Sequence, residues 1–154
     1  MMQMIPLRKL VSAIGLAVAI TVAVATPSVY FIHDYVDAAE QIAFKARLNA
    51  ARVAQYIYTH GDMWQYQRLR LAEIVQLPDT GEQPVRQKIY DRDRRLVIDE
   101  GPALSAPVMS RSVPIVVAGS TVGVFVVEES LRQTLYETWL VALVCLLIGF
   151  GAYF

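Results

Sequence analysis

Hydrophobic residues are concentrated at the two ends of the 154-residue chain, in two segments without charged side chains. The first, residues 10–32, is long enough to cross a hydrocarbon core of about 30 Å as a helix. The second, residues 138–154, is shorter, and we expect a membrane helix at 137–154 that is cut short. The pattern therefore predicts a tail at 1–9, two membrane helices, and a water-soluble domain at 33–136 between them.

Residues 34–58 contain neither Pro nor Gly, and small apolar residues recur there at spacings of three and four. This heptad spacing is typical of a long helix packed against another helix. We call the repeat the heptad seam: Val36, Ala39, Ala43, Ala46, Ala50, Val53 and Ile57. A second apolar stripe lies on another side of the helix: Phe44, Leu48, Ala51 and Tyr58. We interpret the heptad seam as a dimer and signalling surface. The alternative is that both stripes belong to the core of one chain.

The rest of the soluble segment predicts a short helix followed by a sheet. The helix is expected at 63–75, and a loop is expected at 78–84, where Pro and Gly interrupt the pattern. Short apolar runs then predict strands at 86–91, 96–99, 111–118 and 122–128. The last two are apolar on both faces, so we expect them at the centre of the sheet, joined by a turn at 119–121. The fold class is α+β, with an antiparallel sheet of four or five strands, and Ser130 is expected to cap the second membrane helix.

Charge is confined almost entirely to the soluble segment. Every acidic residue, and every basic residue except Arg8 and Lys9, lies between Asp34 and Glu137. Basic residues next to a membrane helix favour the cytoplasmic side, so both termini are expected in the cytoplasm and residues 33–136 outside it. The lipid bilayer is thus an expected partner. The soluble segment has no basic excess, which argues against nucleic acid as a partner.

An alternative reading of the first apolar segment is a cleaved signal peptide. The small residues at 23–25 form a plausible cleavage site after a basic start. However, the apolar segment continues to Ile32 and exceeds the apolar core of a typical signal peptide. A retained anchor is therefore the favoured interpretation.

Three stretches resemble the periplasmic PAS-like sensor domains of bacterial receptors, the Cache or PDC group. Residues 89–97 resemble the strand-turn-strand hairpin of that group, 113–116 with 122–126 resemble its closing strands, and 130–132 are similar to its exit segment. The group usually has glycine where this chain has Arg94. The resemblance implies a sensor in the bacterial inner membrane, of the kind joined to diguanylate cyclase, phosphodiesterase or histidine kinase domains.

The resemblance also indicates a ligand site on the sheet face that points away from the long helix. Arg86, Lys88 and Tyr90 alternate along one strand, share a face, and would suit a small anion, although such a face is also typical of a solvated surface. The charged residues at 91–95 are interpreted as a solvated turn. We expect no metal site, no cofactor and no catalytic site.

The function expected from these features is that of an extracytoplasmic sensory input module. It would form a homodimer through the long helix and the membrane segments, and relay a cue to a cytoplasmic output domain that is missing from these residues. The alternative is a small membrane protein that serves as a structural or accessory subunit.

Overall fold

The structure, a computed structural model, describes residues 7–75 and 84–153. Residues 1–6 of the predicted tail and most of the predicted loop at 78–84 lie outside these ranges. The described chain divides into two units, one made of residues up to 35 together with 133 onwards, the other of residues 36–132. The architecture is α+β, as predicted.

Helix α1 (Leu7–His60) begins in the first unit and ends in the second, without interruption and with Pro27 inside it. The predicted helix at 63–75 forms as two pieces, the 3₁₀ helix η1 (Gly61–Tyr66) and helix α2 (Arg68–Val75). Between them, Gln67 leaves helical geometry, and its side chain accepts a hydrogen bond from the Tyr56 hydroxyl of α1.

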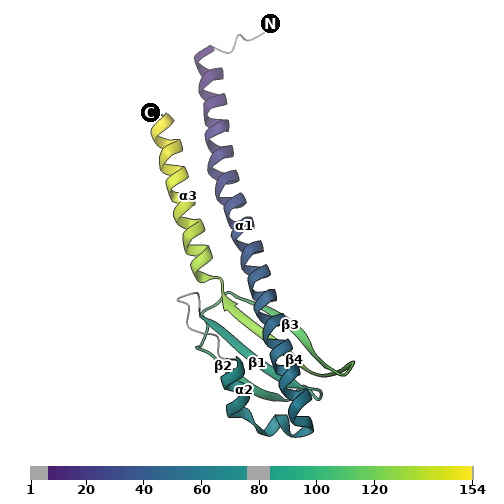
Figure 1. The fold of residues 1–154 in the computed structure, drawn as a ribbon. Coiled ribbons are helices and arrows are strands. Elements are labelled where there is room, and N and C mark those ends of the chain that lie inside the picture. The colour runs from purple at the N-terminus through teal and green to yellow at the C-terminus, as the bar shows by residue number, and fades with distance from the viewer. Residues whose placement is uncertain (1–6, 76–83, 154) are drawn as a thin grey trace. The chain divides into compact units, whose positions relative to one another are not determined.

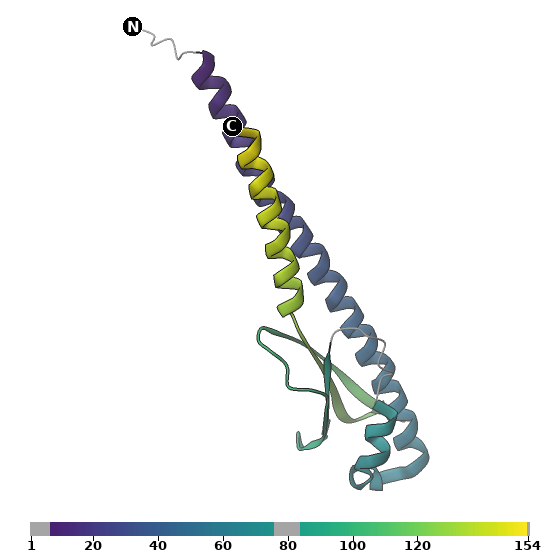
Figure 2. The same cartoon turned by 90° about the vertical axis from the view of Figure 1, so that its left-hand side faces the viewer.

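In the first unit, α1 lies beside helix α3 (Arg132–Tyr153), as both views of the ribbon show (Figures 1 and 2). A Cβ atom added to Gly149 would lie 3.7 Å from the Cβ atom of Ala19, so the two helices are in close contact there. The Tyr30 hydroxyl of α1 interacts with the carboxylates of Asp34 and Glu137, the latter on α3.

The apolar side chains of this unit mostly point outward. Between Leu10 and Ile32 the large aliphatic side chains of α1 are exposed, as are several of α3. By length and composition alone, α1 is the single helix in the described residues that could cross a membrane, a test that a signal sequence would also pass. Of the two predicted membrane helices, the longer first one is thus a candidate span, and the shorter second one, over its described residues, is not.

The second unit contains a four-stranded antiparallel sheet with strand order β2-β1-β4-β3. Its strands are β1 (Val85–Asp91), β2 (Leu96–Glu100), β3 (Val108–Val117) and β4 (Ser120–Ser130). All four predicted strands are confirmed. Figure 2 shows the α1 segment of this unit and α2 on the same face of the sheet.

The prediction that the last two strands form the centre of the sheet is wrong for β3. The central strands are β1 and β4, and β3 is an edge. On β3, Met109 and Ile115 are buried, whereas Pro114 and Val116 are exposed, so its apolar run is covered on one face only. A proline in a strand also fits an edge position, because proline lacks a backbone donor.

The core of the second unit lies between the helices and one face of the sheet. Ile42, Ala46 and Val53 of α1 are fully buried, as are Phe125 and Ile89 of the sheet. Small and large apolar side chains alternate along this face of α1, as Ala46 and Ala50 lie between Ile42 and Val53.

A buried polar chain links three elements through this core. The Asn49 side-chain amide of α1 donates to the Gln87 side-chain oxygen of β1 at 2.9 Å. The Gln87 amide in turn donates to the carbonyl of Val75, at the end of α2, at 3.2 Å. Both side chains are buried, and each has a partner, as buried polar groups require.

The last strand leads directly into α3. The Ser130 hydroxyl accepts a hydrogen bond from the backbone N–H of Arg132 at 3.3 Å, which agrees with the capping role predicted for Ser130. The same hydroxyl donates to the Ser105 carbonyl at 2.7 Å. Ser130 therefore ties the β2–β3 connection to the start of α3.

Candidate functional site

The outer face of β1 presents the three residues expected to bind a ligand. Arg86, Lys88 and Tyr90 are half-buried and alternate with the buried Gln87 and Ile89, so the prediction that they share a face is confirmed. This face points away from α1 and α2. Their role in binding stays a prediction.

Both cations on this face already have carboxylate partners from neighbouring strands. Arg86 forms two hydrogen bonds with Asp99 of β2, at 2.6 and 2.7 Å. Lys88 contacts both oxygens of Glu128 of β4, at 2.7 and 2.8 Å. The pairs run diagonally, because Lys88 stands directly opposite Asp99 and Arg86 directly opposite Glu128. The four charges cancel, so an anion would have to displace a carboxylate.

The pairing also shifts the ionisation of its members. Hydrogen bonds from Arg86 lower the pKa of Asp99, an effect larger than the opposing desolvation. In the same way, the hydrogen bond to Asp99 raises the pKa of Arg86. The β1–β2 hairpin was expected from residues 89–97, but the pairing of β1 with β4 was not, and neither Asp99 nor Glu128 was predicted as a partner of these cations.

The heptad seam divides between two environments. Ala46, Ala50, Val53 and Ile57 are at most 5% exposed and pack in the core of their own chain. This corrects their assignment to a dimer surface, because a side chain buried against its own sheet has no surface to offer a partner helix. Nearer the N-terminus of α1, Val36 is exposed, while Ala39 and Ala43 are partly buried.

The second apolar stripe of α1 is the exposed one. Phe44, Leu48 and Tyr58 are 67%, 39% and 73% exposed. Heptad spacing occurs in both stripes, so spacing alone could not decide which one faces the sheet.

The turn between β1 and β2, residues 91–95, is organised by the carboxylate of Asp91. One of its oxygens accepts hydrogen bonds from the backbone N–H groups of Asp93 and Arg95, at 2.9 and 2.8 Å. The Asp91 carbonyl accepts from the N–H of Arg94 at 3.1 Å. Arg94 has φ +61°, the conformation for which glycine is the usual residue. Arginine thus adopts the positive φ at the position where the PAS-like group usually has glycine.

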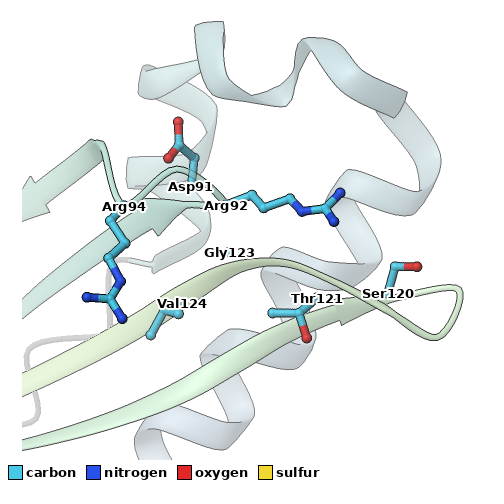
Figure 3. Close-up of a pocket in the computed structure, with 7 residues that line it drawn as sticks. All are labelled: Asp91, Arg92, Arg94, Ser120, Thr121, Gly123 and Val124. Carbon is cyan, nitrogen blue, oxygen red and sulfur yellow. The ribbon is translucent and has the colours of Figure 1, made fainter.

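The turn between β3 and β4 lies at the same end of the sheet. It is formed by Ala118 and Gly119, with φ +48° and +80°, and is one residue earlier than predicted because Ser120 already belongs to β4. Positive φ at both central residues is typical of a type I′ hairpin turn. A cavity of about 460 Å³ lies between the two turns. It is lined by Asp91, Arg92, Arg94, Ser120, Thr121, Gly123 and Val124 (Figure 3).

Residues that could bind a metal ion do not cluster in the described part of the chain, where no three His, Cys, Asp or Glu side chains lie together. His60 stacks on the ring of Tyr56, with centroids 4.1 Å apart. Cys145 lies on α3, in the other unit.

Comparison of the chain with protein-family models, with curated proteins and with solved structures finds no match. The resemblance to PAS-like sensor domains therefore depends on the sequence stretches named above.

Proposed function

We propose that this chain is the extracytoplasmic sensory input module of a bacterial transmembrane signalling protein. In this proposal both α1 and α3 cross the inner membrane, the sheet domain lies in the periplasm, and a displacement of the helices reaches an output domain in the cytoplasm. The proposal rests mainly on α1, one helix that joins the apolar segment to the core of the sheet domain.

The exposure of side chains in the first and last parts of α1 supports the proposal. Its first part exposes aliphatic side chains such as Leu10, Val18 and Val29, which suit a lipid environment. Its last part buries Ile42, Ala46 and Val53 completely. A rearrangement of the sheet domain would therefore act directly on a helix that enters the bilayer. A cue shifts such a balance only if it binds one packing better than the other.

Topology is the first test, and it uses single cysteines in a Cys145→Ser background. Leu69, which is 84% exposed, is replaced by Cys and treated in intact bacterial cells with a membrane-impermeant maleimide. Labelling of intact cells is the expected result, and labelling only after lysis would contradict a periplasmic domain. Ala50→Cys, at a position only 4% exposed, is the matched control that should react only after unfolding.

Helix phase is the second test. The chain is fused to a histidine kinase output domain, and residues are inserted after Asp34. One inserted residue rotates the helix by about 100°, whereas seven restore the phase to within about 20°. We expect one residue to change kinase output and seven to restore it. Unchanged output throughout the series would sink the coupling model.

Dimerisation is proposed through α1 and the membrane helices. Two copies inserted in the same orientation could pair in parallel along the exposed stripe of Phe44, Leu48 and Tyr58, whose spacing suits helix pairing. Phe44→Cys in the Cys145→Ser background should then form a disulfide between copies under mild oxidation. Ala50→Cys is again the control. Equal cross-linking of both variants, or of neither, would count against this surface.

A further inference from the structure

The cavity between the two turns contains two arginines whose charges are not neutralised by the protein. Within residues 7–75 and 84–153, neither Arg92 nor Arg94 has a hydrogen-bond or ion-pair partner through its guanidinium group. In contrast, Arg86 and Lys88 on the outer face each contact a carboxylate. The tip of the sheet therefore offers an added anion two guanidinium groups without a partner in the described residues.

The carboxylate among the lining residues, that of Asp91, forms no ion pair with these arginines in the described part of the chain. Asp91 is buried, and one of its oxygens is used by the backbone N–H groups of Asp93 and Arg95. Figure 3 shows its carboxylate directed away from Val124 and Thr121, while the Arg92 side chain extends toward Ser120. The Asp91 carboxylate thus stabilises the turn and does not neutralise Arg92 or Arg94.

Side chains, rather than backbone, supply the donors in this cavity. The N–H groups of Asp93, Arg94 and Arg95 all donate to Asp91, so the loop offers no ring of free amides to an anion. Ser120 and Thr121 also line the cavity, and each carries a hydroxyl group. Planar guanidinium groups together with hydroxyls match the oxygens of a phosphate group.

Backbone conformation adds a second observation. Arg94 occupies a left-handed position in which glycine would be less strained, and its side chain lines the cavity. Strain of this kind is often found where a side chain serves a site. Gly123, whose missing Cβ would lie 2.4 Å from the carbonyl oxygen of Tyr90, keeps β1 and β4 close together beneath the cavity.

We propose that this cavity binds a phosphomonoester group, carried by a soluble molecule or by a lipid headgroup, through Arg92, Arg94, Ser120 and Thr121. The site differs from the outer face of Arg86, Lys88 and Tyr90, and it does not depend on the proposed signalling role. A phosphomonoester carries a charge of about −1.5 to −2 at neutral pH, which the two arginines would balance. Val124 offers an apolar contact for the organic part of the ligand.

The test measures the melting temperature of the full chain in a nonionic detergent, at constant ionic strength, with added inorganic phosphate or glycerol 3-phosphate. We expect a saturable rise, because a ligand that binds the folded state stabilises it. Succinate is the comparison anion. An equal rise with succinate would overturn the proposal. So would the absence of a rise with either phosphate compound, if the lipid arm below also shows none.

Three variants locate the effect. Arg92→Gln and Arg94→Gly should each weaken the apparent affinity by about tenfold or more, because each removes a charged donor. Arg94→Gly should also melt at a higher temperature without ligand, which separates loss of binding from loss of folding. Arg95→Gln is the matched control, from the same loop but outside the cavity lining, and should bind like the wild type. Equal affinity of all variants, or loss in Arg95→Gln as well, would contradict the site.

A second arm distinguishes a soluble ligand from a lipid headgroup. The chain is placed in phosphatidylcholine bilayers with and without phosphatidic acid, and the melting temperature is measured again. A rise that depends on Arg92 and Arg94 in the detergent arm assigns a soluble phosphomonoester. The same dependence only with phosphatidic acid assigns a lipid headgroup, and its absence from both arms refutes binding.

Discussion

The side chains of Asn49 on α1 and Gln87 on β1 meet in the core, joined by a hydrogen bond of 2.9 Å. They are 38 residues apart in sequence, and both are buried. The bond fixes the position of the helix on the sheet, because Gln87 also reaches the end of α2 through the Val75 carbonyl. Displacement of α1 along the sheet would break it.

Replacement of Asn49 by Leu should destabilise the sheet domain. It leaves the Gln87 oxygen buried without a donor, which costs about 1–3 kcal/mol in free energy of unfolding. Chemical denaturation of the full chain in detergent measures the loss. The double variant with Gln87→Leu should lose less than the sum of the two single variants, because the two side chains are coupled. Strict additivity would show that the bond contributes little.

Replacement of Gly123 by Ala should separate the two central strands. The new Cβ would lie 2.4 Å from the Tyr90 carbonyl oxygen, so β1 or β4 must shift, and overpacking of this kind costs about 1–3 kcal/mol. Gly15→Ala is the control, since nothing lies within 4 Å of its added Cβ. Comparable stability of the two variants would contradict the close approach of the strands.

Replacement of Ala118 by Asn should stabilise the β3–β4 turn. Ala118 has φ +48° ahead of Gly119, and Asn-Gly is the preferred pair for a type I′ turn. A gain of up to about 1 kcal/mol in free energy of unfolding is expected, from the strain of a left-handed alanine. Ala118→Val should lose stability at the same position. The order Asn, Ala, Val from most to least stable is the result to check by denaturation.

The pair of Arg86 and Asp99 should make stability depend on acid pH. Because the pKa of Asp99 is lower in the folded state, the unfolded chain binds more protons as the pH falls. The stabilisation is therefore complete above the ordinary aspartate pKa of about 3.9 and disappears as the pH falls through the lowered value. Thermal melts of the wild type should lose more between about pH 5 and pH 2 than those of Asp99→Asn.

Salt provides the control for that prediction. The side chains of Arg86 and Asp99 are 34% and 27% exposed, so solvent screens their attraction. The difference between wild type and Asp99→Asn should shrink as salt is added. A difference that does not respond to salt would point to packing rather than charge.

Local patterns in the sequence predicted the elements well, and the reason is that each pattern depends on neighbouring residues. The uninterrupted helix through Tyr58, the four strands and the contact between Ser130 and the start of α3 all follow from periodicity and turn residues. The predicted ends of the elements differ from the structure by one or a few residues. For example, the prediction assigns Ser120 to the turn, whereas the turn is formed by Ala118 and Gly119 and Ser120 belongs to β4.

Local sequence pattern could not predict which residues far apart in the chain contact one another. Two apolar stripes on α1 have the same spacing, and only the assembled sheet selects Ala46 and Val53 for the core and leaves Phe44 exposed. Likewise, Arg86 alternates with Lys88 whether or not carboxylates stand on the adjacent strands. The positions of Asp99 and Glu128 follow from strand order, which the sequence pattern placed differently.

The exposed edge of strand β3 bears on whether separate copies of the chain aggregate. An exposed strand edge offers backbone donors and acceptors with which a strand of another molecule can continue the sheet, and such continuation leads toward aggregates. Pro114 removes one donor from β3, and the exposed side chain of Arg111 places a charge on the same strand. Both features oppose the joining of sheets from separate copies of the chain at high protein concentration.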